Sequence, residues 1–412
     1  MRFPKKFKDS VLNQLLFSLV ILLVIRIGTF LPIPGINHND LAFYLQRHST
    51  AKYVLSTFSG NSTFIIGLFT LNIFPYINAT IFAQLLFTFL PRLARLQKEG
   101  DLQSRRAIAR LTRFLTLIIA VIQSLGVVLY LRQILFDWNF FLALEILIWL
   151  TSGTMIVLWL SELITSYGLG NGTSLLIYTN IISSLPNIFK KLINENTNTF
   201  SSTFSLIIIS LLLFISLYGI IFLQKGTRQI ELLSSKQLNQ KLIYTNDYYL
   251  PLRFNQAGVM PIILTSVVLV IPNYIINSGI VPWLSFLGSF KFLYWITYFG
   301  LILAISSFYS SIVINPKDLS DQLQKMAVTI PGLRPGIQTT FYLKRVTKRI
   351  TLIGATMLAI ITVVPNFLES TLNISSLNGL STTSLLILAG VILDLMREIE
   401  NIYYSNVYSN KY

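Results

Sequence analysis

Long apolar segments separated by shorter polar ones dominate the hydropathy pattern of this chain. Each is roughly 18 to 25 residues long, which is the length of a helix that crosses a hydrocarbon core of about 30 Å. None has the alternating pattern of strands in a membrane barrel. The expected spans lie at 12–31, 72–90, 112–131, 140–162, 172–189, 205–223, 256–275, 292–314, 350–366 and 382–398. The pattern therefore predicts an all-α polytopic membrane protein with ten transmembrane helices.

Residues 59–90 do not fit one simple span. A single helix over the apolar part, 63–90, would be about 42 Å long, against a hydrocarbon core of about 30 Å. Asn72 and Pro75 lie where a break is needed, because proline removes a helix hydrogen bond and clashes with the preceding turn. We expect a re-entrant half-helix at about 59–70, followed by a full span, with a cavity around the break. One long kinked helix is the alternative.

Basic residues are distributed unevenly between the two sides of the predicted membrane protein. Of the 32 Lys and Arg, 25 fall on the side of the termini, 6 fall on the opposite side, and Arg26 lies inside the first span. This split places the termini on the cytoplasmic or stromal side. The basic loops 224–253 and 315–349 exceed what topology requires, and they could present positive charge to ribosomal RNA or to an acidic motor protein. A membrane-surface role is equally compatible with their charge.

The composition excludes several kinds of chemistry. The chain has no cysteine and only two histidines, so disulfides and Cys/His metal sites are ruled out, and it has no phosphate-binding glycine loop for a nucleotide. We therefore expect no catalytic residue, cofactor or metal. Ionisable side chains in or at the edges of the spans are few, namely Arg26, Glu145, Glu162 and Asp394. A secondary transporter for a small solute, or a membrane-embedded enzyme, would need midplane polar ligands or paired catalytic groups, which the sequence lacks.

Seven segments, spread in order over most of the chain, resemble the SecY/Sec61 family of protein translocase channels. They are RIGTFLPIPGI, FPYINATIFAQLL, LQKEGDLQSRRAIARLTRFLTL, ELITSYGLGNGTSLLIYTNII, LPLRFNQAGVMPIIL, the pair NPKDLSDQLQKM and IPGLRPGIQTTFYL, and TSLLILAGVILDLM. The resemblance implies two pseudo-symmetric five-helix halves around a central pore, here 1–190 and 191–412. It also implies a lateral gate between helices 2 and 3 and helices 7 and 8, where Gln123 lies on the third helix.

The resemblance further implies a plug and a pore ring. The half-helix at 59–70 corresponds to the family's plug, and its small residues Ser59, Gly60 and Gly67 suit a displaceable element. The aliphatic ring that closes the family's pore corresponds here to six isoleucines: Ile77, Ile81, Ile177, Ile181, Ile263 and Ile387. A narrow collar of such β-branched side chains is stiff, dewets, and resists ion leakage without any charged group.

The partners and the membrane are also implied by the resemblance. Arg334, in GLRPG, matches the family's critical loop arginine, and Arg228 matches one of a pair of arginines whose second member is Gln229 here. Both would contact a SecA motor or a ribosome. A SecE-type subunit, with or without a SecG-type subunit, would complete a channel for signal-bearing precursors that is not an enzyme. The AT-rich codon bias suggested by the composition favours a plastid thylakoid membrane over a bacterial plasma membrane.

Overall fold

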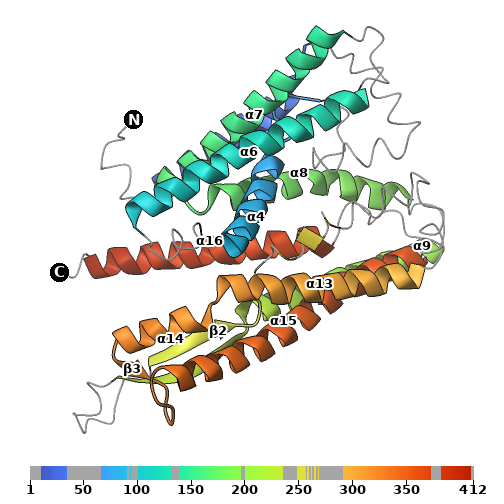
Figure 1. The fold of residues 1–412 in the computed structure, drawn as a ribbon. Helices are drawn as coiled ribbons and strands as arrows, with labels where there is room; N and C mark the ends of the chain where they lie inside the picture. Colours follow the sequence, from blue (N-terminus) through green and yellow to red (C-terminus); the bar gives the residue numbers. More distant parts are fainter. Residues whose placement is uncertain are drawn as a thin grey trace. The chain divides into compact units, whose positions relative to one another are not determined.

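The computed structural model describes residues 11–34, 66–90, 101–131, 139–195, 200–234, 248–256, 291–372 and 382–409, with single residues at 93, 258, 261, 264, 265 and 268. Within it the chain divides into two compact units, Met1–Phe189 with Val391–Tyr412, and Lys190–Gly390. Figure 1 shows their helices and strands.

The first unit is a set of packed helices. Contacts join α4 to α6, α6 to α7, and α1 to α7. Its helices are α1 (Val11–Phe30), α4 (Phe74–Phe89), α6 (Leu102–Leu131), α7 (Phe140–Tyr167) and α8 (Gly172–Glu195), together with the later part of α16 (Thr382–Ser409). The core of α7 is its buried stripe of residues at helical spacing, which includes Ile146, Leu150 and Val157. The unit is therefore a helical bundle built around α6 and α7.

The second unit combines long helices with a small sheet. The helix α15 packs against α9, α13 and α14. The elements are α9 (Phe200–Lys225), β1 (Thr227–Ser234), β2 (Tyr248–Arg253), α13 (Lys291–Val313), α14 (Pro316–Lys325), β3 (Val328–Thr329) and α15 (Ile337–Leu372). The predicted span at 256–275 lies almost entirely outside the described residues.

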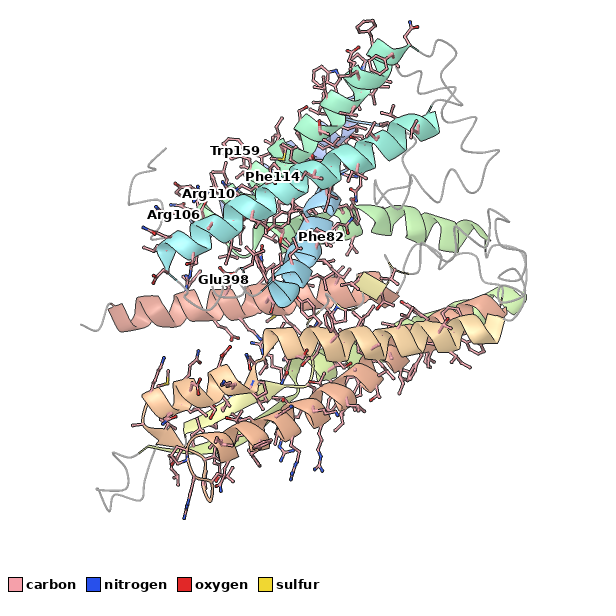
Figure 2. The ribbon with its side chains drawn as sticks, in the orientation of Figure 1. Phe82, Arg106, Arg110, Phe114, Trp159 and Glu398 are labelled. Carbon is pink, nitrogen blue, oxygen red and sulfur yellow. The ribbon has the colours of Figure 1, made fainter. Side chains whose placement is uncertain are left out.

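The outer faces of the long helices are apolar, as expected for helices in lipid. Along α6, Phe114, Ile122 and Leu129 are exposed at helical spacing, and Figure 2 shows Phe114 following Arg106 and Arg110 along this helix. Five of the described helices are long and apolar enough to cross a membrane by length and composition. The predicted polytopic helical membrane fold is confirmed by this and by the structural relatives reported below, whereas the number of ten spans stays a prediction.

The two predicted basic loops contain regular secondary structure that was not predicted from the sequence. A three-stranded sheet of order β2-β1-β3, antiparallel throughout, is formed by 227–234 and 248–253 of the first loop and 328–329 of the second. The helix α15 begins at Ile337 instead of near 350, and α6 begins at Leu102 instead of near 112. The strands form because their apolar residues alternate with polar ones, so that Ile230 and Leu252 point into a shared core. Pro251 is tolerated because β2 is an edge strand.

Candidate functional site

The break between the first two predicted spans is an irregular stretch, 66–73, which we call the unwound segment. Its backbone pairs with the end of α1, through Leu68 N–H to Leu31 O at 2.9 Å and Ile33 N–H to Ile66 O at 3.3 Å. Three further N–H groups close tight turns within the segment or into α4. Because buried backbone groups in lipid need partners inside the protein, these contacts allow a non-helical chain to persist here.

Three glycines let the unwound segment approach α1 and α7 closely. A Cβ added to Gly67 would lie 2.2 Å from the carbonyl oxygen of Thr29. On the facing helices, a Cβ on Gly28 would meet the ring of Phe69, and one on Gly153 would lie 2.0 Å from the carbonyl oxygen of Leu68. The segment is thus held between two helices at distances that only glycine permits.

The described part of the predicted plug is not helical. Residues 66–70 form a β-bridge between Pro32 and Gly67 and then successive turns, instead of the end of a half-helix. The physical reason is that Gly67 pairs with the backbone of α1's end, which an α-helix could not do. Ser59 and Gly60 lie outside the described residues, so the plug itself stays a prediction.

Asn72 ends the unwound segment and connects it to α8. Its φ is +46°, a left-handed conformation that asparagine tolerates better than most residues. Its side-chain Nδ2 donates to Oδ1 of Asn180 at 3.0 Å, and the residue is almost fully buried. The helix α4 then begins at Phe74, with Pro75 in its first turn, where the missing N–H costs no hydrogen bond. The predicted break at Asn72 and Pro75 is confirmed.

The hydrogen bond between Asn72 and Asn180 is close in sequence to both predicted isoleucine pairs. Ile77 and Ile81 are on α4, which begins two residues after Asn72, while Ile177 and Ile181 flank Asn180 on α8. Each pair has i,i+4 spacing and therefore shares one helix face. Ile77 is buried, and the other three are half-buried. The two pairs thus lie on α4 and α8, and the segment that leads into α4 is hydrogen-bonded to α8.

The remaining ring and gate residues are placed separately. Ile387 is half-buried on α16, in the second unit, and Ile263 lies outside the described residues. A closed ring of six isoleucines therefore stays a prediction. Gln123 is half-buried on α6, and in the described part of the chain its Oε1 has no hydrogen-bond partner. Its neighbour Ser124 bonds within its own helix, to the carbonyl oxygen of Val121.

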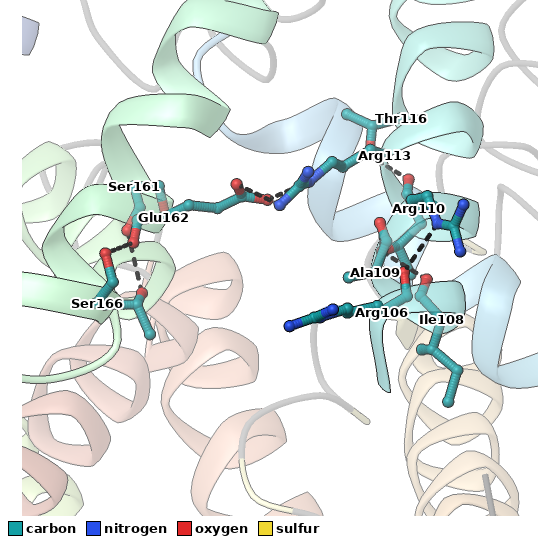
Figure 3. Close-up of polar contacts among 11 residues, drawn as sticks. Arg106, Ile108, Ala109, Arg110, Arg113, Thr116, Ser161, Glu162 and Ser166 are labelled. Atoms are coloured by element: carbon teal, nitrogen blue, oxygen red, sulfur yellow. Dashed lines mark hydrogen bonds and ion pairs between the residues drawn. The ribbon is translucent and has the colours of Figure 1, made fainter. Parts of the chain in front are cut away.

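A bidentate ion pair joins α6 to α7. Arg113 Nε and Nη2 donate to the two carboxylate oxygens of Glu162 at 2.7 and 2.8 Å, as Figure 3 shows. The other edge-of-span carboxylates make weaker local contacts: Glu145 accepts from Trp149, and Asp394 pairs with Arg397 at 3.4 Å. Within the described residues no group of three or more His, Cys, Asp or Glu could hold a metal ion. Of these three contacts, the pair of Arg113 and Glu162 joins two helices, and the other two each lie within one helix.

The sheet, α14 and the start of α15 form a compact structure, 227–234 with 248–254 and 314–350, which we call the loop lobe. Its core consists of seven buried apolar residues: Ile230, Leu252, Leu323, Ile330, Leu343, Val346 and Ile350. Arg228 on β1 and Arg334 in the turn before α15 are both exposed on this lobe. The core thus provides a folded support for the two predicted partner-binding arginines.

A buried hydroxyl cluster positions the turn that carries Arg334. The hydroxyl oxygens of Ser320 on α14 and Thr339 on α15 lie 2.6 Å apart, and both are within hydrogen-bonding distance of the carbonyl oxygen of Gly336, at 3.1 and 2.6 Å. Gly332 and Gly336 both have positive φ, as this turn requires. Sequence reasoning missed Ser320 and Thr339, because a hydroxyl residue on a helix carries no signal of a partner 19 residues away.

The comparisons with known proteins agree on one family. The family model described as SecY matches residues 67–396. A SecY protein translocase subunit of Trieres chinensis is 57% identical, over 97% of this chain and 97% of its own length. One of Porphyra purpurea is 40% identical over 98% of each chain. Among solved structures, a SecY whose plug domain is described as stabilising the closed channel has a TM-score of 0.67 at 15% identity, covering 99% of this chain and 96% of its own. Sec61 in a canine ribosome-channel complex scores 0.61 at 15% identity, with the same coverage.

Proposed function

The chain belongs to the SecY family, and from this membership we infer that it is the central, protein-conducting subunit of a Sec translocase. It passes signal-bearing unfolded polypeptides across the membrane and releases apolar segments sideways into lipid. It is a channel and not an enzyme. The observation that carries this conclusion is the 57% identity to a SecY translocase subunit over 97% of the chain. A secondary transporter for a small solute is not favoured.

The pore would be sealed by the six isoleucines and opened by displacement of the plug. One contact in the first unit and one physical principle support this. Ile77 and Ile81 on α4 belong to the same structural neighbourhood as Ile177 and Ile181 on α8, because Asn72 and Asn180 are hydrogen-bonded. The aliphatic collar needs no charged group to exclude ions, since a narrow apolar constriction dewets. An apolar signal helix would enter at a lateral gate that includes Gln123, and each Leu or Ile it places in lipid contributes a few tenths of a kcal/mol.

The loop lobe would receive the partner that delivers substrates. Arg228 and Arg334 are exposed on a folded support, where they could contact ribosomal RNA or an acidic surface of a SecA motor. A related channel has been solved in a complex with a ribosome. A SecE-type subunit, with or without a SecG-type one, would join the two halves of the channel.

The membrane is proposed to be the plastid thylakoid membrane. The relatives from Porphyra purpurea and Guillardia theta are algal SecY subunits, at 40% identity each. A Synechococcus elongatus relative at 37% identity keeps the bacterial plasma membrane as the alternative.

The function is tested by reconstituting the chain with a SecE-type subunit and SecA, and by measuring ion leak and transport of a signal-bearing precursor. The variant carries serine at Ile81, Ile181 and Ile387, and a matched control carries serine at the lipid-facing residues Ile122, Ile353 and Ile360, which are exposed. We expect both variants to transport precursor, and only the ring variant to leak more ions than the wild type. Absence of precursor transport by the wild type, where a known translocon works, would refute the channel function; an equal leak from both variants would refute the ring alone.

A further inference from the structure

We propose that the N-terminal part of α15 binds the headgroup of an anionic lipid. The site consists of four cationic side chains on two successive turns of the helix, Lys344, Arg345, Lys348 and Arg349. All four are exposed, and in Figure 2 nitrogen-tipped side chains project outward from this part of α15. In the described part of the chain none of the four forms an ion pair with a carboxylate. The cluster can therefore neutralise a negative charge that no described carboxylate supplies.

The four cations share a face with the lipid-exposed residues of the same helix. Their spacing of i, i+1, i+4 and i+5 continues directly into Leu352 and Ile353, which are 56% and 47% exposed. The opposite face of this part of the helix is buried, because Leu343, Val346 and Ile350 pack into the core of the loop lobe. One face of α15 is thus basic at its beginning and apolar afterwards.

The position of the cations along the helix corresponds to the headgroup layer. Lys348 precedes Leu352 by one turn, which is about 6 Å at 1.5 Å per residue. Headgroup and interfacial regions extend about 5 to 8 Å beyond each side of the hydrocarbon core. If Leu352 and Ile353 contact the acyl chains, Lys348 and Arg349 lie among the phosphate groups, and Lys344 and Arg345 lie one turn further out.

The apolar continuation favours lipid over RNA as the ligand. A lipid molecule has acyl chains that would cover Leu352 and Ile353 and an acidic headgroup that would meet Lys348 and Arg349. An RNA phosphate would satisfy the cations but would leave the adjoining apolar face uncovered. Arginine also binds phosphate through two parallel hydrogen bonds, which adds orientation to the charge attraction.

A local fluorescence measurement tests the site. Because the chain has no cysteine, a Leu352→Cys substitution gives a single labelling position beside the cations. The full-length, labelled protein is reconstituted in phosphatidylcholine with increasing phosphatidylglycerol, and quenching by a brominated form of each lipid gives their relative binding at this position. We expect phosphatidylglycerol to be preferred. The double variant Lys348→Gln/Arg349→Gln should lower this preference by up to roughly fivefold for each cation removed.

Two control variants separate local binding from overall charge and from misfolding. The charge-retaining variant Lys348→Arg/Arg349→Lys should keep the preference. Lys325→Gln, which removes an exposed cation at the end of α14, should leave it unchanged. The proposal is overturned if the wild type shows no preference for phosphatidylglycerol, if Lys325→Gln reduces the preference as much per charge, or if the double variant loses ribosome binding while its lipid preference is unchanged. The last result would assign the cations to RNA.

Discussion

The unwound segment and the loop lobe both contain irregular backbone, but different interactions hold it. In the unwound segment, chain-to-chain hydrogen bonds, close glycine contacts and one pair of asparagines fix the path. In the loop lobe, a small apolar core fixes it, as in a water-soluble domain. Lipid offers no hydrogen bonds to a free peptide group and no hydrophobic drive to bury apolar side chains, whereas water offers both. Hydrogen bonds and close packing therefore hold the segment in lipid, and burial of apolar side chains holds the lobe in water.

This comparison predicts that a single methyl group at Gly67 has the largest effect. In Gly67→Ala, the new Cβ would meet the backbone oxygens of Thr29 and Leu31, neither of which can move away without breaking the bridge to α1. We expect a loss of about 4 kcal/mol or more of stability, as for other severe steric conflicts. The measurement is the yield and the thermal unfolding of the protein in detergent.

The matched control for this change is Gly126→Ala on α6. A Cβ at Gly126 meets nothing within 4 Å, so this variant should be neutral or more stable by up to about 1 kcal/mol, because alanine is the better helix former. Equal losses for both variants would show that alanine is harmful for reasons other than the contact with α1, and would contradict the explanation.

The loop lobe should be most sensitive at Leu343, which is fully buried in its core. Leu343→Ala should cost about 2 to 5 kcal/mol, the usual range for a cavity left by a core leucine. The loss should be local: the loops become accessible to protease and partner binding falls, while α13 and the first unit stay folded. Limited proteolysis with mass spectrometry measures this.

Leu352→Ala provides the comparison on the same helix. Leu352 is exposed, so lipid replaces the missing side chain and the lobe should keep its resistance to protease. If both leucine variants were digested at the same rate, the lobe would not depend on its own apolar core, and the contrast between the two regions would disappear.

The smallest predicted effect concerns the asparagine pair. Asn180→Ala removes the acceptor for Asn72 without changing the left-handed backbone at 72, and should cost about 0.6 to 1.7 kcal/mol, as for hydrogen bonds between membrane helices. Asn72→Gly keeps the left-handed conformation and removes the donor. A double-mutant cycle of thermal unfolding is the measurement. Fully additive losses would mean that the two side chains do not stabilise each other.

The break in the helix before α4 was predictable from the sequence, but the contacts that hold the broken segment were not. The length of the apolar stretch and Pro75 were sufficient to expect an interruption, since both act through local geometry. The contacts of Gly67 with α1 and of Asn72 with α8 join residues far apart in the sequence, and a single sequence contains no signal of such pairs. The half-helix expected at about 59–70 does not extend over 66–70 for this reason, because a tertiary backbone pairing replaces local helix formation there.

In the loop lobe, by contrast, a local signal was present in the sequence and was not used. The sequence interpretation of the lobe rested on its basic charge, while the alternation of polar Gln229 and Glu231 with apolar Ile230 and Leu232 is a strand signal that was not used. The partner-binding arginines themselves came from the family resemblance, as did the six isoleucines. Nothing in the local pattern separates Ile77 or Ile177 from other isoleucines in apolar helices.

The glycine contacts of the unwound segment impose an order on the protein's own biogenesis. Residues 66–73 are synthesised soon after α1, and their pairing with residues 31 and 33 can form early. Gly153, which provides the close contact with α7, is synthesised about 80 residues later. At a rate of about 5–20 residues per second, this is a delay of several seconds. Asn180 follows later still. During this interval an irregular peptide lies in or near lipid with half of its enclosure absent, so the nascent chain itself must be sheltered, by a finished channel or an insertion factor, until α7 arrives.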